Sequence, residues 1–330
     1  MKNLSRYNQQ IMLPEIGEEG QALLHCAHVL IIGAGGLSST LLPILTGAGI
    51  GTISLYDEDH VEEKNLHRQT LFTMNDINHF KAKVAATRLE SINPDCKIKP
   101  YIQRLTPANV AEAVAPADII IDAADNFAVT YILSDACLDN KKPFVSASVL
   151  GLLGFVGCFC NEAPSYRAVF PSLPSQANSC STTGVLGGVV SIIASIQAQL
   201  VLAYLLKFKP APPGLMITFN GHGFIFGSFS FLNAPEPEEN KKIPFISMNN
   251  ICSSDIIFDL RSVEEMPSLP IKESIRLSLE DIPLWASNLS GNREQRIVFC
   301  CRSGLRAANA AYYFKEAGFS KVALIAFSAT

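Results

Sequence analysis

The N-terminal part of the chain alternates between apolar runs and short polar turns. Val29–Ile32 is an apolar run without charge, with the length of a strand that is buried on both faces. After it come a glycine-rich turn, Gly33–Gly36, an apolar segment of helical length, and a second apolar run, Thr52–Tyr56, that ends on Asp57. This order of strand, glycine turn, helix, strand and acid predicts a βαβ unit of a Rossmann-like α/β fold.

The turn after the first strand carries the residues expected of a nucleotide site. Gly33, Gly35 and Gly36 would let the backbone approach phosphate groups at the N-terminus of the next helix. Asp57 can accept hydrogen bonds from ribose hydroxyl groups. Ser38 stands where a dinucleotide fingerprint has its third glycine, so the turn alone does not decide between a dinucleotide and ATP. A tight turn without a ligand is the simplest alternative.

Residues further along the chain favour ATP. The apolar run Ala117–Asp122 predicts another buried strand, with Asp125 at its carboxyl end, where an open parallel sheet binds its ligands. Arg68 and Lys81 lie between these strands, and two cations and a carboxylate suit a triphosphate with Mg²⁺ better than a nicotinamide. Taken singly, Arg68 and Lys81 read as surface charges and Asp125 as a helix cap. Only the combination indicates a site.

Five motifs in this order and spacing resemble the MoeB/ThiF/HesA family, bacterial relatives of ubiquitin-activating enzymes. The resemblance covers about residues 4–232 and rests on RYNQQI, GAGGLS, DEDHVEEKNLHRQ, KAKVAATRLESINP and DAADN. It implies a ThiF-type fold and a homodimer. It also implies ATP- and Mg²⁺-dependent adenylation of the C-terminal glycine carboxylate of a small ubiquitin-like sulfur-carrier protein that ends in Gly-Gly.

The resemblance also assigns roles to residues of this chain. Asp57 would bind ribose, and Asp125 would hold Mg²⁺. The phosphates would be bound by Asn65, Arg68 and Lys81. The remaining nucleotide-binding positions are Gly33, Gly35, Gly36, Asp59, Gln69 and Asn126.

The chain departs from the family pattern at two places. The N-terminal segment of the family supplies an arginine finger to the partner subunit, and here that position is Gln9, with only Arg6 of the arginine pair present. Family members also carry zinc between two cysteine pairs, where this chain has Ser165–Ala168 and Asn233–Pro237. A closed tetrahedral zinc site needs four such ligands, so we expect no zinc.

A polar loop at residues 171–184 precedes a long apolar segment. Cys180 in this loop matches a family cysteine that in some members bonds covalently to the activated carrier, although an inert cysteine is an equal alternative. The segment Gly184–Leu206 has no charged residue and is long enough to span a bilayer. Because Ser191 and Gln197 interrupt it, we expect a buried core helix and no membrane span.

A charged, proline-rich stretch at residues 233–242 separates a second α/β pattern from the first. The runs Ile256–Arg261 and Ile297–Cys300 predict buried strands, and the second of them delivers Cys301 to a polar loop before a helix at residues 307–318. A cysteine among backbone N–H groups and two arginines is expected to have a lowered thiol pKa.

This second pattern resembles the rhodanese fold over about residues 245–325, with the active-loop motif present as CRSGLR. The resemblance makes Cys301 the persulfide nucleophile, with Arg302 and Arg306 as its charge partners, and implies a persulfide donor. Residues 264–280 do not match the rhodanese pattern, and the usual closing helix is absent from the sequence given. A buried structural cysteine is the alternative.

Composition sets broader limits. With 330 residues we expect an adenylation domain at 1–232, a linker at 233–244 and a rhodanese-like domain at 245–330. The net charge of −4 offers no basic field for nucleic acid, and nine cysteines without a regular framework favour reduced thiols in the cytoplasm. Three other functions stay open: adenylation of a short peptide in natural-product maturation, a non-catalytic nucleotide-binding scaffold for a sulfur carrier, and an NAD dehydrogenase. Whether the pathway is of the molybdopterin or thiamin type is not encoded in these motifs.

Overall fold

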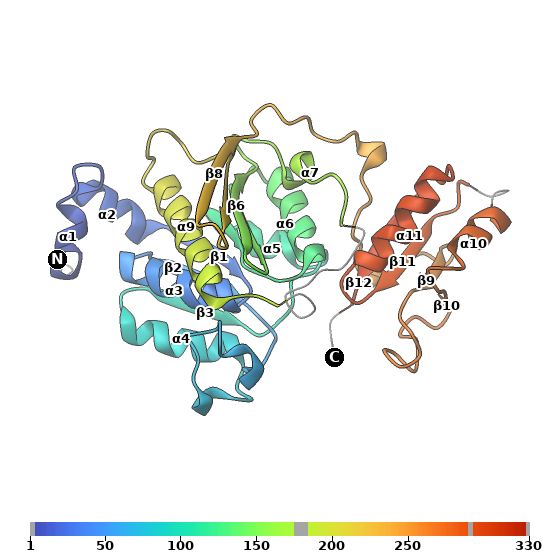
Figure 1. Cartoon of the computed structure of the whole chain (residues 1–330), viewed down its shortest axis with the longest axis horizontal. Coiled ribbons are helices and arrows are strands. Elements are labelled where there is room, and N and C mark those ends of the chain that lie inside the picture. The colour runs from blue at the N-terminus through green and yellow to red at the C-terminus, as the bar shows by residue number, and fades with distance from the viewer. Residues whose placement is uncertain (1–3, 175–183, 290–292, 328–330) are drawn as a thin grey trace.

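The computed structural model describes residues 4–174, 184–289 and 293–327, which form two α/β units side by side (Figure 1). The first unit is built on an eight-stranded sheet with strand order β3-β2-β1-β4-β5-β6-β7-β8. Strands β3 to β5 of that order are parallel, and β5 to β8 pair antiparallel. The strands are β1 His28–Ile32, β2 Thr52–Tyr56, β3 Lys97–Tyr101, β4 Ile119–Asp122, β5 Phe144–Leu150, β6 Leu153–Phe159, β7 Leu215–Asn220 and β8 Ile225–Ser230.

Helices cover both faces of this sheet, as a parallel sheet requires. The alternating side chains of β1 and β4 divide between two apolar clusters, one shared with α3, α4 and α9 and the other with α5, α6 and α7. The helices are η1 Leu4–Tyr7, α1 Asn8–Ile11, α2 Gly17–Cys26, α3 Gly36–Ala48, η2 Glu63–Asn65, η3 Met74–Asp76, α4 Lys81–Ile92, α5 Val110–Val114, α6 Phe127–Asp139, α7 Tyr166–Val169 and α9 Gly187–Leu205.

Helix α9 is the one described helix that is long and apolar enough to cross a membrane. It packs against α3 and strands β5 and β6 inside the first unit. Gln197 in its middle is fully buried and donates to the backbone carbonyls of Asp122 (2.8 Å) and Val145 (3.2 Å). The polar interruption seen in the sequence therefore ties α9 to the sheet as a core helix.

The second unit contains a parallel four-stranded sheet with the order β10-β9-β11-β12. Its strands are β9 Ile256–Asp259, β10 Ile275–Arg276, β11 Ile297–Cys301 and β12 Val322–Ala326, and its helices are α10 Ile282–Asn288 and α11 Leu305–Glu316. Two short helices, η4 Glu239–Lys241 and η5 Met248–Asn250, precede it. Helix α11 starts two residues before the predicted Ala307, because Gly304 (φ 86°) takes the left-handed conformation and turns the chain into the helix.

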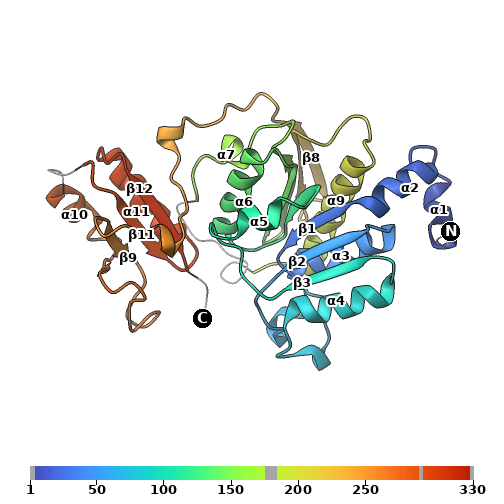
Figure 2. The same ribbon diagram turned by 180° about the vertical axis from the view of Figure 1, so that it is seen from behind.

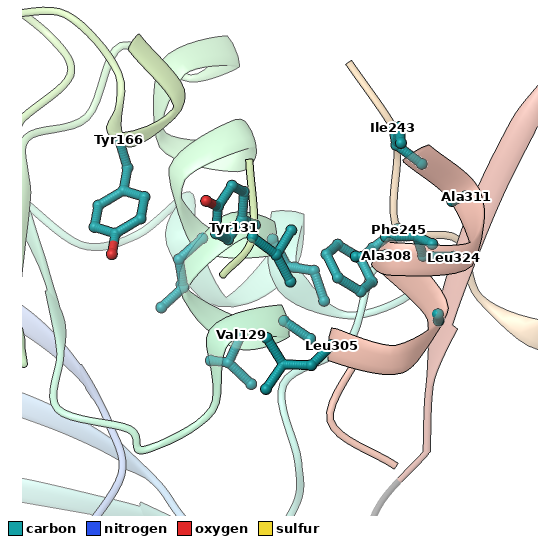
Figure 3. Close-up of a cluster of buried hydrophobic side chains, with 14 of the residues drawn as sticks. Val129, Tyr131, Tyr166, Ile243, Phe245, Leu305, Ala308, Ala311 and Leu324 are labelled. Atoms are coloured by element: carbon teal, nitrogen blue, oxygen red, sulfur yellow. The ribbon is translucent and has the colours of Figure 1, made fainter. Parts of the chain in front are cut away.

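The two units are in contact, because residues of α6 and of α11 belong to one buried apolar cluster. The two units also lie side by side when the molecule is seen from behind (Figure 2). Ile243 and Phe245, at the end of the connecting segment, are buried in one apolar cluster with residues of both helices (Figure 3). The sequence pattern did not predict this contact, because a charged linker is typical of domains that move freely.

Candidate nucleotide site and cysteine loop

The strand order places one crevice in the first unit. Strands β1 and β4 are neighbours, and the chain winds away from them in opposite directions, towards β2 and β3 on one side and β5 on the other. Ligands of open α/β sheets bind at such a switch point, outside the carboxyl ends of the strands. The turn after β1, Asp57 after β2 and Asp125 after β4 all lie at this edge, as the sequence predicted.

The glycine turn is held close to the next strand. Gly33 has a φ of 96°, and a Cβ added there would lie 2.8 Å from the carbonyl oxygen of Ala123, so only glycine fits. Asp57 Oδ2 accepts a 2.6 Å hydrogen bond from the backbone N–H of Ala34, and Asp57 Oδ1 accepts one of 2.8 Å from Asp59. Burial raises the pKa of Asp57, and the nearby Lys81 charge opposes that rise. Asp57, at the carboxyl end of β2, therefore fixes the glycine turn.

Lys81 brings a buried cation to the same edge. It is the first residue of α4 and is only 5% exposed. Its Nζ lies 2.9 Å from Asp59 Oδ2, and the Asp59 side chain is 66% exposed. A lysine is rarely buried without a strong partner, and a largely solvated carboxylate is a weak one. The arrangement leaves a positive charge available to an anionic ligand.

The segment from Asn65 to Gln69 lies beside the glycine turn. Arg68 Nη2 donates to Asn65 Oδ1 at 3.0 Å, which orients the guanidinium group. The buried Gln69 lies near Gly35, whose added Cβ would be 3.7 Å from Gln69 Nε2. Gln69 Oε1 has no hydrogen-bond partner among the described residues. A buried, unpaired acceptor beside a phosphate-type turn fits a site that a polar ligand completes.

Asp125 and Asn126 complete the edge of the crevice. The Asp125 side chain is exposed and makes no hydrogen bond or ion pair with the residues that the structure describes. Asn126, and not Asp125, caps α6, because its side chain accepts from the N–H of Ala128 at 3.0 Å. The helix-cap alternative for Asp125 therefore does not apply, and its carboxylate is left for a ligand.

A second acid behind Asp125 was not singled out in the sequence. Asp122 is fully buried and accepts from the hydroxyls of Thr130 (2.7 Å) and Ser146 (2.8 Å) and from the N–H of Ala124 (3.1 Å). Burial raises its pKa to about 6, and these hydrogen bonds oppose the rise. Asp122 joins β4, β5 and α6 under the turn that carries Asp125. In the sequence, Asp122 could have been recognised as an acidic residue at the end of an otherwise apolar strand.

The described residues contain no cluster of three or more histidine, cysteine or acidic side chains that could hold a metal. Magnesium usually binds one or two carboxylates together with substrate phosphates and water. The exposed carboxylate of Asp125, at the carboxyl end of β4, fits that mode of binding.

In the second unit, Cys301 ends β11 in a cradle of backbone N–H groups. Its Sγ accepts from Gly304 N (3.1 Å) and Ala307 N (3.4 Å), and the residue is 0% exposed. The expected lowering of its pKa is wrong for this arrangement: burial raises the pKa of the thiol, and the N–H groups and the Arg306 charge oppose that rise. Arg306 makes two hydrogen bonds to Glu265, of 2.6 and 2.7 Å, so its charge is shared with a carboxylate.

Comparison with known proteins agrees with both units. The ThiF family model matches residues 7–243, and the model of the rhodanese-like domain matches residues 246–327. The chain belongs to the ThiF family. The predicted fold class, a ThiF-type α/β fold with a rhodanese-like domain, is thereby confirmed.

Three curated relatives within this ThiF family are similar over much of the chain. A probable molybdopterin-synthase adenylyltransferase of Porphyra purpurea is 30% identical and covers 91% of this chain and 85% of its own. The sulfur carrier protein adenylyltransferase of Thermus thermophilus is 38% identical over 66% of this chain and 83% of its own. The adenylyltransferase and sulfurtransferase MOCS3 of Aedes aegypti is 38% identical over 68% of this chain and 52% of its own.

Solved structures of the E. coli protein MccB share the ThiF fold. The complex of MccB with ATP has a TM-score of 0.61 and 21% identity and covers 71% of this chain and 73% of that one. At this identity the match establishes the fold and not the substrate.

Four residues that the family pattern singled out are not placed at the crevice by the structure. Arg6 donates to the carbonyl of Ile92 at 2.5 Å, and Gln9 is exposed on α1. Arg302 is exposed beside the Cys301 loop, and Cys180 lies outside the described residues. The predicted nucleotide-binding residues all lie around the crevice. They are Gly33, Gly35, Gly36, Asp57, Asp59, Asn65, Arg68, Gln69, Lys81, Asp125 and Asn126.

Proposed function

We propose that this chain adenylates the C-terminal glycine carboxylate of a small ubiquitin-like sulfur-carrier protein and then transfers sulfur to it as a thiocarboxylate. The observation that carries the proposal is the pairing, in one chain, of a crevice suited to ATP with a rhodanese-type cysteine loop. The relatives named sulfur carrier protein adenylyltransferase and MOCS3 support it. An NAD dehydrogenase would leave Arg68, Lys81 and Asp125 without a task.

In the first stage the carrier carboxylate attacks the α-phosphorus of ATP, and the bond to pyrophosphate breaks. The glycine turn and Asp57 hold the phosphates and ribose, and Gln69 gains a partner for its buried oxygen. Arg68 and Lys81 offset the negative charge that spreads over the phosphate oxygens. Asp125 would hold Mg²⁺, which supplies further charge neutralisation at the phosphates. The products are a carrier acyl-adenylate and pyrophosphate.

In the second stage the terminal sulfur of a Cys301 persulfide attacks the acyl carbon, and AMP leaves. The carrier is then joined to Cys301 through an acyl disulfide. A second thiol, for which Cys180 is the candidate, attacks the Cys301 sulfur, so that the thiocarboxylate leaves and a protein disulfide forms. The persulfide itself has to come from an external persulfide donor.

We also propose the domain limits and a homodimer. The limits are an adenylation domain at 1–232, a linker at 233–244 and a rhodanese-like domain at 245–330. The edge strand β8 and its flanks leave an apolar surface uncovered in the single chain, formed by Phe224, Ile225, Phe226, Phe229 and Leu232. An apolar edge strand is a liability for a monomer, which supports a second copy as its partner.

The test is ATP–pyrophosphate exchange, measured with and without a ubiquitin-like carrier that ends in Gly-Gly. We expect carrier-dependent exchange that falls at least about 100-fold in Asp125→Asn, because the metal-binding carboxylate is lost. The matched control is Asp139→Asn, an exposed position on α6. Exchange that persists in Asp125→Asn would overturn the metal assignment. ATP binding without exchange for any carrier would favour the scaffold, and exchange with a short peptide alone would favour peptide maturation.

A further inference from the structure

The thiol of Cys301 is sealed on its inner side by its own loop. Backbone N–H groups of Gly304 and Ala307 point at the sulfur, and β11 and α11 surround it. A sulfur-accepting cysteine needs an open path to its donor, because the thiolate has to reach the outer sulfur of the persulfide. The outer side of the loop therefore decides whether the thiol is accessible.

That outer side is covered by the other unit. A Cβ added at Gly304 would lie 3.2 Å from the Cβ of Ala128 on α6 and 2.9 Å from the ring of Phe245. Figure 3 shows Leu305, the first residue of α11, facing Val129, which follows Ala128 on α6. All of these side chains belong to one buried apolar cluster that spans both units. The first turns of α6 thus cap the Cys301 loop.

Polar contacts at the rim hold the cap in place. Tyr312 on α11 reaches the first unit, where its hydroxyl accepts from Leu173 N (3.2 Å) and donates to Pro171 O (3.4 Å). The buried Arg167 pairs with Asp135 on α6 and also donates to the carbonyl of Ile243 at 3.3 Å. The interface therefore has an apolar centre and a hydrogen-bonded rim, the usual build of a specific interface.

We propose that α6 is an autoinhibitory cap on Cys301, and that the rhodanese-like unit has to separate from α6 before a persulfide donor reaches the thiol. This regulation rests on the proposed function, in which Cys301 accepts sulfur. The donor and α6 would compete for the same face of the second unit, the face formed by the Cys301 loop and the start of α11. The cap begins immediately after Asp125 and Asn126, so one helix borders both proposed sites.

The experiment is alkylation of the full chain with iodoacetamide, with the rate at each cysteine followed by peptide mass spectrometry. Cys252 is exposed and sets the fast rate, and Cys300, buried one residue before Cys301 on β11, reports unfolding of the unit. In the unaltered chain we expect Cys301 to react about 100-fold more slowly than Cys252. A Cys301 rate close to that of Cys252 would overturn the proposal.

Two variants open the cap from opposite sides. Tyr312→Ala removes the rim contacts, and we expect the Cys301 rate to rise about 10-fold while Cys300 stays slow. Tyr313→Ala, at an exposed position on the same helix, is the matched control and should leave the rate unchanged. Ala128→Glu adds a charge to the α6 side and should have the same effect as Tyr312→Ala.

If both opening variants leave Cys301 slow, its own loop buries it and the proposal is wrong. If Cys300 reacts in Tyr312→Ala, that variant has unfolded the unit, and Ala128→Glu then decides the question. The labelling needs neither ATP nor a carrier. Its result is therefore separate from pyrophosphate exchange, which tests the proposed function itself.

Discussion

The nucleotide crevice and the cysteine loop have the same local structure, but the residues that lie over them differ. In each, a buried parallel strand runs into a turn with a left-handed glycine, Gly33 (φ 96°) or Gly304 (φ 86°), and then into a helix. Each glycine touches a neighbour that would clash with a Cβ. The neighbour of Gly33 is a strand end of its own sheet, whereas the neighbour of Gly304 is the Phe245 ring, with Ala128 of the other unit in tight contact beside it.

That difference decides what each turn offers to a ligand. Gly33 packs within its own sheet, and the buried Gln69 oxygen beside the turn has no hydrogen-bond partner among the described residues. Because Gly304 packs against α6, the space above Cys301 is filled, and Arg306 is paired with Glu265. The strand–turn–helix device thus provides backbone N–H groups at both places, and what lies over the strand end determines whether they are available.

We expect the largest loss of activity at the nucleotide crevice from a change at Lys81. In Lys81→Met the buried charge at the crevice is lost, and we expect pyrophosphate exchange to fall about 100-fold because charge on the transferring phosphate is no longer offset. Steady-state exchange at saturating carrier measures this.

The matched control for that variant is Lys83→Met, on the same helix and exposed, which should change exchange less than about twofold. Equal losses in the two lysine variants would mean that general electrostatics, and not a built cation site, governs the crevice. Iodoacetamide labelling of Cys301 should be unchanged in both.

The sequence predicted the nucleotide crevice far better than the surroundings of the cysteine loop. Strands β1, β2 and β4 and the positions of Asp57, Arg68, Lys81 and Asp125 follow from local patterns, since buried runs and their terminal residues are encoded within a few positions. The Cys301 cradle was also predicted, but its thiol pKa was not. The cover over it comes from α6, more than 150 residues earlier in the chain, and no local pattern records such packing.

The second prediction concerns the stability contributed by Asp122, which lies under the turn that carries Asp125. Asp122 has a pKa raised to about 6 from an ordinary value of 3.8, so the folded chain binds its proton more tightly than the unfolded chain does. Stability should therefore fall as the pH rises from about 4 to about 6 and stay level above that range. Asparagine at this position does not titrate. We therefore expect the free energy of unfolding of Asp122→Asn, measured relative to that of the unaltered chain, to be about 2 kcal/mol more favourable at pH 7.5 than at pH 4.5.

Urea titrations at the two pH values test this, with Asp139→Asn, an exposed aspartate at the end of the following helix α6, as the control. The control should show no change with pH relative to the unaltered chain. A difference between Asp122→Asn and the unaltered chain that is constant with pH would show that the carboxyl does not titrate in this window.

The smallest expected effect tests whether the cysteine loop is closed by electrostatics as well as by packing. Arg306 holds the pKa of Glu265 at about 2, and in return the carboxylate offsets the arginine charge that would otherwise favour the Cys301 thiolate. In the Tyr312→Ala background, where the cap is open, Glu265→Gln should lower the pKa of the Cys301 thiol, because the Arg306 charge is no longer offset, and raise alkylation at pH 7 about threefold. The neighbouring, solvent-exposed Glu264→Gln is the control. If the pH midpoint of alkylation is the same in both, packing alone closes this region, and the contrast with the crevice reduces to what lies over each strand end.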